Sequence, residues 1–281
     1  RSKRILAKWR SASTASLAVI LIDARKGVLT QTRRHSYLAH LIGIRKVVLA
    51  INKLDLVDYS EEVFRTIIDE YRDFADQIGL EDITPIPLSA LRGDNILAKS
   101  EHTPWYHGPT LMAYLETVEV DELRQQAGAF RLPVQWVNRP NHEFRGFCGT
   151  VAGGAVKPGD RIRVQPSGRE STVERIVTAD GDLPLAVAGQ SITLTLADEI
   201  DISRGDMISD AEKPAEVADQ FEATLVWMGE EPMLPGRAYV MKIGTRSVSA
   251  TITEPKYKVN VNTLQHLAAK TLDLNEIGVC N

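Results

Sequence analysis

The sequence predicts an α/β domain followed by two antiparallel β-barrel domains. Continuous apolar runs alternate with amphipathic helical patterns over residues 1–119. Short alternating strands, separated by turns that contain proline and glycine, fill residues 130–211, and a second β-rich stretch fills residues 216–281. Residues 120–129 are mostly polar, and we expect them to be the linker between the first two domains.

The composition is typical of a soluble globular protein and argues against several other classes. The chain has 281 residues, of which 43% are hydrophobic and 25% charged, and its net charge of −4 gives no overall basic surface for nucleic acid. No apolar run is long enough to span a membrane. The two cysteines, Cys148 and Cys280, lie far apart and lack metal-ligand spacing. These features predict a cytoplasmic protein without a metal site in this chain.

The first half of the α/β domain is predicted from one strand, one helix and a second strand. A continuous apolar run at residues 17–24 is typical of a parallel strand that is covered on both faces. Thr30 is a suitable N-cap for a helix that extends to about Ile42. A second apolar strand is expected at residues 46–51.

The second half of this domain contains the longest predicted helix. That helix extends from about Ser60 to Gln77, because Ser60 can cap it and apolar residues then recur at helical spacing. A short strand is expected at residues 83–88 and a final helix at about residues 110–116. Strand and helix therefore alternate throughout the domain.

A polar motif follows the second predicted strand directly. Residues 52–55 read Asn-Lys-Leu-Asp, at the carboxyl end of a strand, where open α/β sheets bind ligands. The carboxylate of Asp55 can accept from both N1–H and the exocyclic amine of guanine, which adenine cannot offer. The stem of Lys53 can lie along the base. Asn52 can bond to N7 and O6 of the base or brace the neighbouring loop.

A second motif follows the third predicted strand. Residues 87–91 read Pro-Leu-Ser-Ala-Leu, and such a loop can close over the same base, with the N–H of Ala90 donating to O6. The alternative is a polar loop that caps the next helix. The predicted guanine site consists of Asn52, Lys53, Asp55, Ser89, Ala90 and Leu91.

No phosphate-binding loop of the form G-x-x-x-x-G-K-[ST] occurs in the sequence. One D-x-x-G match, at residues 76–79, follows the guanine motif and falls at a predicted helix end, so we interpret it as a coincidence. We therefore expect the chain to enter a G domain of the P-loop NTPase type partway and to lack the final strands of its third domain. No catalytic residue is predicted within the chain.

The predicted order of domains resembles the translational GTPases of the elongation factor Tu class. Residues 23–28 and 31–35 are similar to the strand and helix that follow the second switch in that superfamily. One branch is more similar: the GTP-binding large subunits of bacterial sulfate adenylyltransferase, which also occur as the amino part of a fusion with adenylylsulfate kinase. The stretches that carry this resemblance are residues 89–95, 104–106, 115–119, 134–141, 144–147, 196–206, 227–236 and 274–278.

This resemblance implies a GTPase that binds GTP or GDP and Mg²⁺, with the Mg²⁺ ligands in the missing phosphate loop and switches. It implies that GTP hydrolysis is coupled to the synthesis of adenosine 5′-phosphosulfate from ATP and sulfate by a separate small adenylyl-transferring subunit, without nucleic acid or membrane. The alternative is an elongation factor-type GTPase that delivers aminoacyl-tRNA, and the acidic net charge weakens it. A guanine-nucleotide module that does not hydrolyse GTP is a third interpretation.

Overall fold

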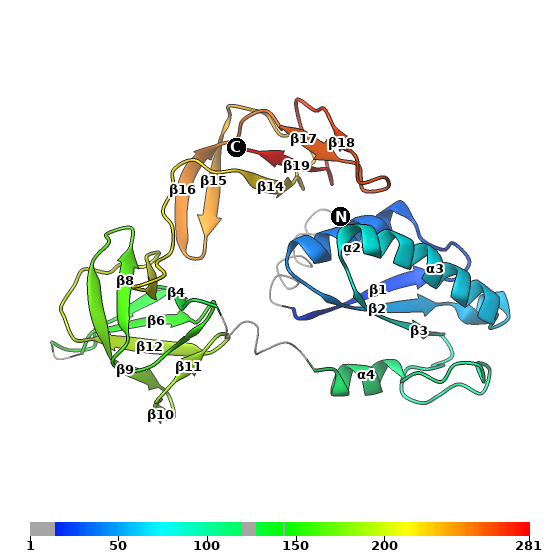
Figure 1. Cartoon of the computed structure of the whole chain (residues 1–281), viewed down its shortest axis with the longest axis horizontal. Helices are drawn as coiled ribbons and strands as arrows, with labels where there is room; N and C mark the ends of the chain where they lie inside the picture. Colours follow the sequence, from blue (N-terminus) through cyan, green and yellow to red (C-terminus); the bar gives the residue numbers. More distant parts are fainter. Residues whose placement is uncertain (1–14, 120–127, 143) are drawn as a thin grey trace. The chain divides into compact units, whose positions relative to one another are not determined.

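The computed structural model describes residues 15–119, 128–142 and 144–281. The chain forms two compact units, shown in Figure 1 and described separately below. Unit 1 contains residues 1–120, 224–233 and 255–279, and unit 2 contains residues 121–223, 234–254 and 280–281. The second β-rich stretch contributes to both units, and the three domain boundaries drawn from the sequence stay a prediction. No helix among the described residues combines the length and apolar character that crossing a membrane requires.

Unit 1 is built around a parallel sheet of three strands. β1 (Leu17–Asp23) pairs with β2 (Lys46–Asn52), and β2 pairs with β3 (Asp82–Pro87). The register places Asp23 opposite Asn52, so both residues leave the sheet at the same edge. The predicted parallel strands are confirmed, but the expectation that the first of them is covered on both faces is wrong, because Val19 and Leu21 of β1 are 40% and 64% exposed.

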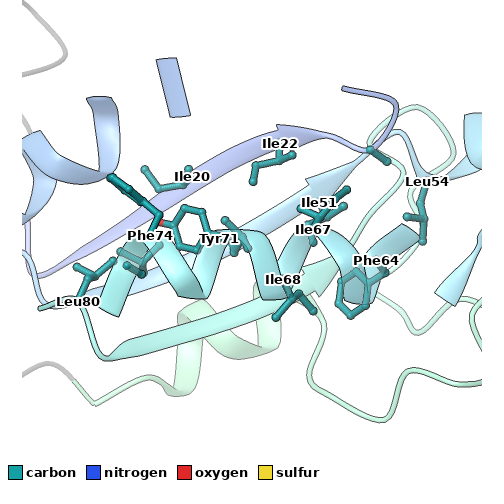
Figure 2. Close-up of a cluster of buried hydrophobic side chains, with 14 of the residues drawn as sticks. Ile20, Ile22, Ile51, Leu54, Phe64, Ile67, Ile68, Tyr71, Phe74 and Leu80 are labelled. Carbon is teal, nitrogen blue, oxygen red and sulfur yellow. The ribbon is translucent and has the colours of Figure 1, made fainter. Parts of the chain in front are cut away.

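Two helices, α2 (Thr30–Leu41) and α3 (Glu61–Ile78), cover one face of this sheet (Figure 1). The apolar stripe of α3 packs on the strands and forms the main core of the unit. Burial of each large apolar side chain contributes about 1.5–3 kcal/mol, so this stripe fixes α3 on the sheet. Figure 2 shows the buried cluster, which includes Ile20, Ile22, Ile51, Leu54, Phe64, Ile67, Ile68, Tyr71, Phe74 and Leu80.

The helix ends agree with the prediction at α3 and differ from it at α2. The Ser60 hydroxyl accepts a hydrogen bond from the N–H of Val63 at 3.3 Å, as expected for an N-cap. Gly79 ends α3 with a φ of 71°, which glycine adopts without strain, and this confirms that the D-x-x-G match lies at a helix end. Thr30 is the first residue of α2 rather than its cap. The N-cap is Leu29, and it makes no side-chain cap bond.

The other face of the sheet carries α4 (Leu111–Thr117), whose N-cap Thr110 accepts from the N–H of Ala113 at 3.3 Å. The buried side chains on this face are Val48, Ala50, Ile86 and Leu88, and Leu111 and Tyr114 of α4 pack against them. Both faces of β2 are therefore covered, and residues 47–51 are fully buried.

Unit 1 also contains an antiparallel sheet from the carboxyl-terminal part of the chain. Leu38 of α2 forms a small buried cluster with Val261 and Ile277. The strands of this sheet, in spatial order, are β14 (Ala223–Val226), β19 (Ile277–Cys280), β17 (Tyr257–Val259) and β18 (His266–Leu267).

Unit 2 consists of antiparallel strands and turns, as the sequence predicts. Two predicted turns carry glycine at positive φ, namely Gly159 at 93° and Gly168 at 73°. The strands are β4 (Arg131–Pro133), β5 (Trp136–Asn138), β6 (Gly146–Thr150), β7 (Ala155–Val156), β8 (Arg161–Gln165), β9 (Glu170–Thr178), β10 (Gly181–Asp182), β11 (Ala186–Val187), β12 (Ser191–Leu196), β13 (Met207–Asp210), β15 (Ala238–Ile243) and β16 (Arg246–Thr251).

The main sheet of unit 2 has eight strands in the order β4-β13-β8-β9-β12-β6-β5, with β10 paired to β9. The N–H of Arg131 donates to the carbonyl of Gly153 at 3.0 Å, and the N–H of Ala152 donates to the carbonyl of Arg131 at 2.8 Å. These bonds hold β4 against the segment that follows β6. Among the described residues the strand pairings form an open path, so a closed barrel is not found at residues 130–211, and the number of barrels stays a prediction.

The packing of α3 predicts a large loss of stability when its central isoleucine is shortened. Ile67 is 4% exposed in the main core, so Ile67→Ala should lower the free energy of unfolding of unit 1 by about 2–5 kcal/mol. Asp69→Ala, at an exposed position of the same helix, should change it by less than about 0.5 kcal/mol. Hydrogen exchange of the α3 amides measures this free energy for unit 1 alone, and equal protection in both variants would contradict the packing.

Candidate guanine-binding site

The loops that follow β2 and β3 are joined by backbone hydrogen bonds. The N–H of Leu88 donates to the carbonyl of Ile51 at 2.8 Å, and the N–H of Leu54 donates to the carbonyl of Leu88 at 3.1 Å. The two predicted motifs, at residues 52–55 and 87–91, are thereby brought together at one edge of the sheet. Their proximity is confirmed, and their binding of guanine stays a prediction.

Asn52 links the two loops through one oxygen atom. Its Oδ1 accepts from the N–H of Lys53 at 2.7 Å and from the N–H of Ala90 at 2.9 Å. The sequence allows Asn52 either to contact the base or to brace the neighbouring loop, and in the structure it braces the loop. The N–H of Ala90, which the sequence suggests as a donor to guanine O6, is engaged by Asn52 here.

Lys53 has an unusual backbone and an anchored side chain. Its φ of 65° lies in the left-handed region, which costs a residue with a side chain roughly 1 kcal/mol. The hydrogen bond to Asn52 holds this conformation. Nζ of Lys53 donates to Oδ2 of Asp23 at 2.8 Å. The Lys53 side chain is nevertheless 45% exposed, so its stem is open to a ligand.

Asp55 lies at the start of the short 3₁₀ helix η1 (Leu54–Val57). Its side chain is only 6% exposed, and its Oδ2 is 3.9 Å from Nε of Arg92. No donor among the described residues makes a hydrogen bond to this carboxylate, so its acceptor positions are open. Arg92 is 64% exposed and can move away when another donor approaches.

The remaining predicted residues divide into a buried turn and an exposed tip. Ser89 is fully buried, its hydroxyl accepts from the N–H of Arg92 at 3.3 Å, and its carbonyl accepts from the N–H of Gly93 at 2.8 Å. Ser89 therefore shapes the turn. Leu91 is 88% exposed at the tip of the same turn, where a ligand can reach it.

Sequence reasoning missed the role of Asp23 at this edge. Its Oδ1 accepts from the backbone N–H and Nε of Arg25 at 3.1 and 3.0 Å, and its Oδ2 accepts from Nη2 of Arg25 at 2.7 Å. The Arg25 guanidinium and the Lys53 ammonium hold the pKa of the Asp23 carboxyl well below its usual range. The feature that could have revealed this role is the register of the parallel strands, which puts Asp23 beside Asn52.

A second group that sequence reasoning missed braces the loop after β3. The hydroxyl of Tyr59 donates to Oδ2 of Asp94 at 2.8 Å, and the hydroxyl of Ser100 donates to Oδ1 at 2.7 Å. Nε1 of Trp105 donates to the carbonyl of Tyr59 at 3.2 Å. Burial and the hydrogen bond to Asp94 raise the pKa of Tyr59 to about 12, so its hydroxyl stays a donor at neutral pH.

The brace made by Asn52 predicts a specific change in loop mobility. Asn52→Ala removes the acceptor for two N–H groups, so exchange of the Lys53 and Ala90 amides should become faster by about tenfold. Asn52→Asp keeps an acceptor of the same reach and should preserve slow exchange. Hydrogen exchange measured by mass spectrometry checks both variants, and equal protection in Asn52→Ala and the parent would contradict the brace.

Comparison with known proteins gives two family matches and several similar relatives. Residues 7–129 match the family described as elongation factor Tu GTP binding domain, and residues 220–281 match the family described as GTP-eEF1A C-terminal domain-like. Sulfate adenylyltransferase subunit 1 of Chromobacterium violaceum is 56% identical over 271 residues. The chain is a homologue of sulfate adenylyltransferase subunit 1. This agrees with the branch that the sequence motifs indicate and favours it over the elongation factor alternative.

The bifunctional enzyme NodQ of Rhizobium sp. (strain N33) is similarly related, at 55% identity over 271 residues. The match covers 96% of this chain in both cases, but 56% of the Chromobacterium subunit and 42% of NodQ. The chain thus spans about half the length of these relatives. A crystal structure of sup35 complexed with GDP aligns with a TM-score of 0.51 and 23% identity, over 96% of this chain and 70% of that one. That likeness supports the fold alone.

Proposed function

We propose that the chain binds the guanine base of GTP or GDP at the edge formed by the loops after β2 and β3. The observation that supports this most is the buried Asp55 carboxylate, 6% exposed and 3.9 Å from its nearest cation. A carboxylate presents two acceptor oxygens, and guanine presents two adjacent donors, N1–H and the exocyclic amine. Adenine lacks this pair, so such a site discriminates between the two purines.

The other predicted residues have distinct proposed roles around the base. Lys53 offers the apolar stem of an exposed side chain to one face of the ring. Leu91, exposed at the tip of the turn after β3, offers a second apolar contact to the base. Asn52 and Ser89 hold the two loops, and the N–H of Ala90 can turn from Asn52 to guanine O6 when the base is present.

The role proposed for the whole protein is that of the GTPase subunit of a sulfate adenylyltransferase. Homology to subunit 1 proteins over 96% of this chain supports it. The GTPase would couple GTP hydrolysis to the formation of adenosine 5′-phosphosulfate from ATP and sulfate by a small adenylyl-transferring subunit in the cytoplasm. Mg²⁺ and the phosphates would be held by a phosphate loop and switches, and no phosphate-loop motif occurs in this sequence. Among the described residues no three metal-ligating side chains cluster.

Replacement of one carboxylate oxygen of Asp55 with an NH₂ group should change which purine base the site prefers. In the full-length protein, Asp55→Asn should weaken GDP binding by on the order of 10⁴-fold, because an amide cannot accept from both guanine donors. Xanthosine diphosphate, which carries a carbonyl at position 2, should bind the variant better than GDP. Fluorescence titration with both nucleotides measures this, and unchanged GDP affinity would rule out Asp55 as the reader of guanine. Asp58→Asn, at an exposed position nearby, is the matched control and should bind GDP normally.

The proposed coupling predicts a dependence on the partner's substrates. The full-length protein should co-purify with a small ATP-using subunit, and GTP should raise the yield of adenosine 5′-phosphosulfate from ATP and sulfate. GTP turnover should rise when that subunit, ATP and sulfate are all present. The elongation factor alternative predicts stimulation by ribosomes and aminoacyl-tRNA instead, with no response to sulfate. An assay of GTP hydrolysis under both sets of conditions separates the two.

A further inference from the structure

We propose that Asp23 is a positioning residue for the guanine base, acting by holding the Lys53 side chain in the orientation in which its stem can lie along the ring. This inference rests on the proposed guanine site and adds to it a residue outside both sequence motifs. It concerns the last residue of β1, a strand that neither motif includes.

Asp23 reaches the Lys53 side chain from the neighbouring strand. Asp23 ends β1 and lies opposite Asn52 in the parallel register, one residue before Lys53. Its Oδ2 is 2.8 Å from Nζ of Lys53, a charge-assisted bond across the edge of the sheet. The Asp23 side chain is 17% exposed, whereas that of Lys53 is 45% exposed. The anchor is thus sheltered, and the anchored side chain is accessible.

The carboxylate of Asp23 is itself immobilised. Arg25 meets it with a guanidinium on both oxygens, at 3.0 and 2.7 Å, and with its backbone N–H at 3.1 Å. A planar fork of this kind fixes the orientation of a carboxylate. The Oδ2 atom that Arg25 holds is the atom that accepts from Lys53, so the position of Nζ is set by groups of the β1 loop.

An anchor of this kind lowers the entropy cost of binding for a lysine side chain that contacts a flat ring. A free lysine side chain samples many rotamers, and ordering it costs up to about 2 kcal/mol when a ligand binds. Lys53 bears this constraint already in the described structure, because Asn52 holds its backbone and Asp23 holds its ammonium. Preorganisation of this kind strengthens binding by lowering the cost of ordering.

The test is a double-mutant cycle on GDP binding by the full-length protein, with fluorescent GDP as the probe. Asp23→Asn should weaken GDP binding on the order of tenfold, because an amide holds an ammonium less strongly than a carboxylate does. Lys53→Met keeps an apolar stem without the charge. In the Lys53→Met background, Asp23→Asn should change the affinity less than twofold, because the group through which Asp23 acts is gone.

The controls separate positioning from simple stabilisation of the fold. Asp58→Asn makes the same chemical change at an exposed position nearby and should bind GDP like the parent. If Asp23→Asn costs the same tenfold with and without the Lys53 ammonium, Asp23 does not act through Lys53 and the proposal is overturned. If Asp23→Asn does not fold, Lys53→Met alone decides: a loss of less than twofold would remove any role for an anchor.

Failure of this proposal is distinguishable from failure of the guanine site. If the parent protein does not bind GDP, or binds ADP equally well, the guanine site is wrong and the role of Asp23 falls with it. If the parent binds GDP selectively and Asp23→Asn binds it equally well, only the positioning role is refuted.

Discussion

The parallel pairing of β1, β2 and β3 is the constraint on which the candidate site depends. Parallel strands send their carboxyl ends to one edge, so three loops that are distant in the sequence must meet there. Residues 47–51 of β2 are buried on both faces of the sheet, and a shift of the register by one residue would turn each side chain to the opposite face. The positions of Asp23 and Asn52 beside each other follow from this register alone.

At that edge, hydrogen bonds to side chains add to the backbone bonds that join the loops. Asn52 supplies one oxygen to two N–H groups in different loops, and Asp94 accepts two hydroxyl groups from either side of the loop after β3. The bond from the Lys53 N–H to Asn52 offsets part of the strain of Lys53, whose φ of 65° is unfavourable for a residue with a side chain.

Local patterns in the sequence were sufficient for most of the first domain and insufficient for contacts between distant segments. The cap at Ser60 and the apolar stripe of α3 were predictable, because both depend on residues within one or two turns. The start of α2 was misplaced by one residue, since Thr30 makes no cap bond there. The contact between Asp23 and Lys53 was missed, because it spans 30 residues and depends on the strand register. The order of the strands in the main sheet of unit 2 depends on similarly distant pairings, which no local pattern reveals.

Opposite charges at the edge hold the loops after β1 and β2 in place. Lys53, Asp23 and Arg25 alternate in sign, and each cation is within hydrogen-bond distance of the carboxylate between them. Asp55 stands apart from this chain of charges, with Arg92 at 3.9 Å and an open set of acceptors. Lys53 and Asp23, which are proposed to orient the base, are therefore already hydrogen-bonded within the edge. The Asp55 carboxylate, which is proposed to recognise the base, keeps its acceptor positions open. In the proposed binding mode, Arg92 withdraws from Asp55 and the Ala90 N–H turns from Asn52 to the base, so the rest of the edge keeps its arrangement.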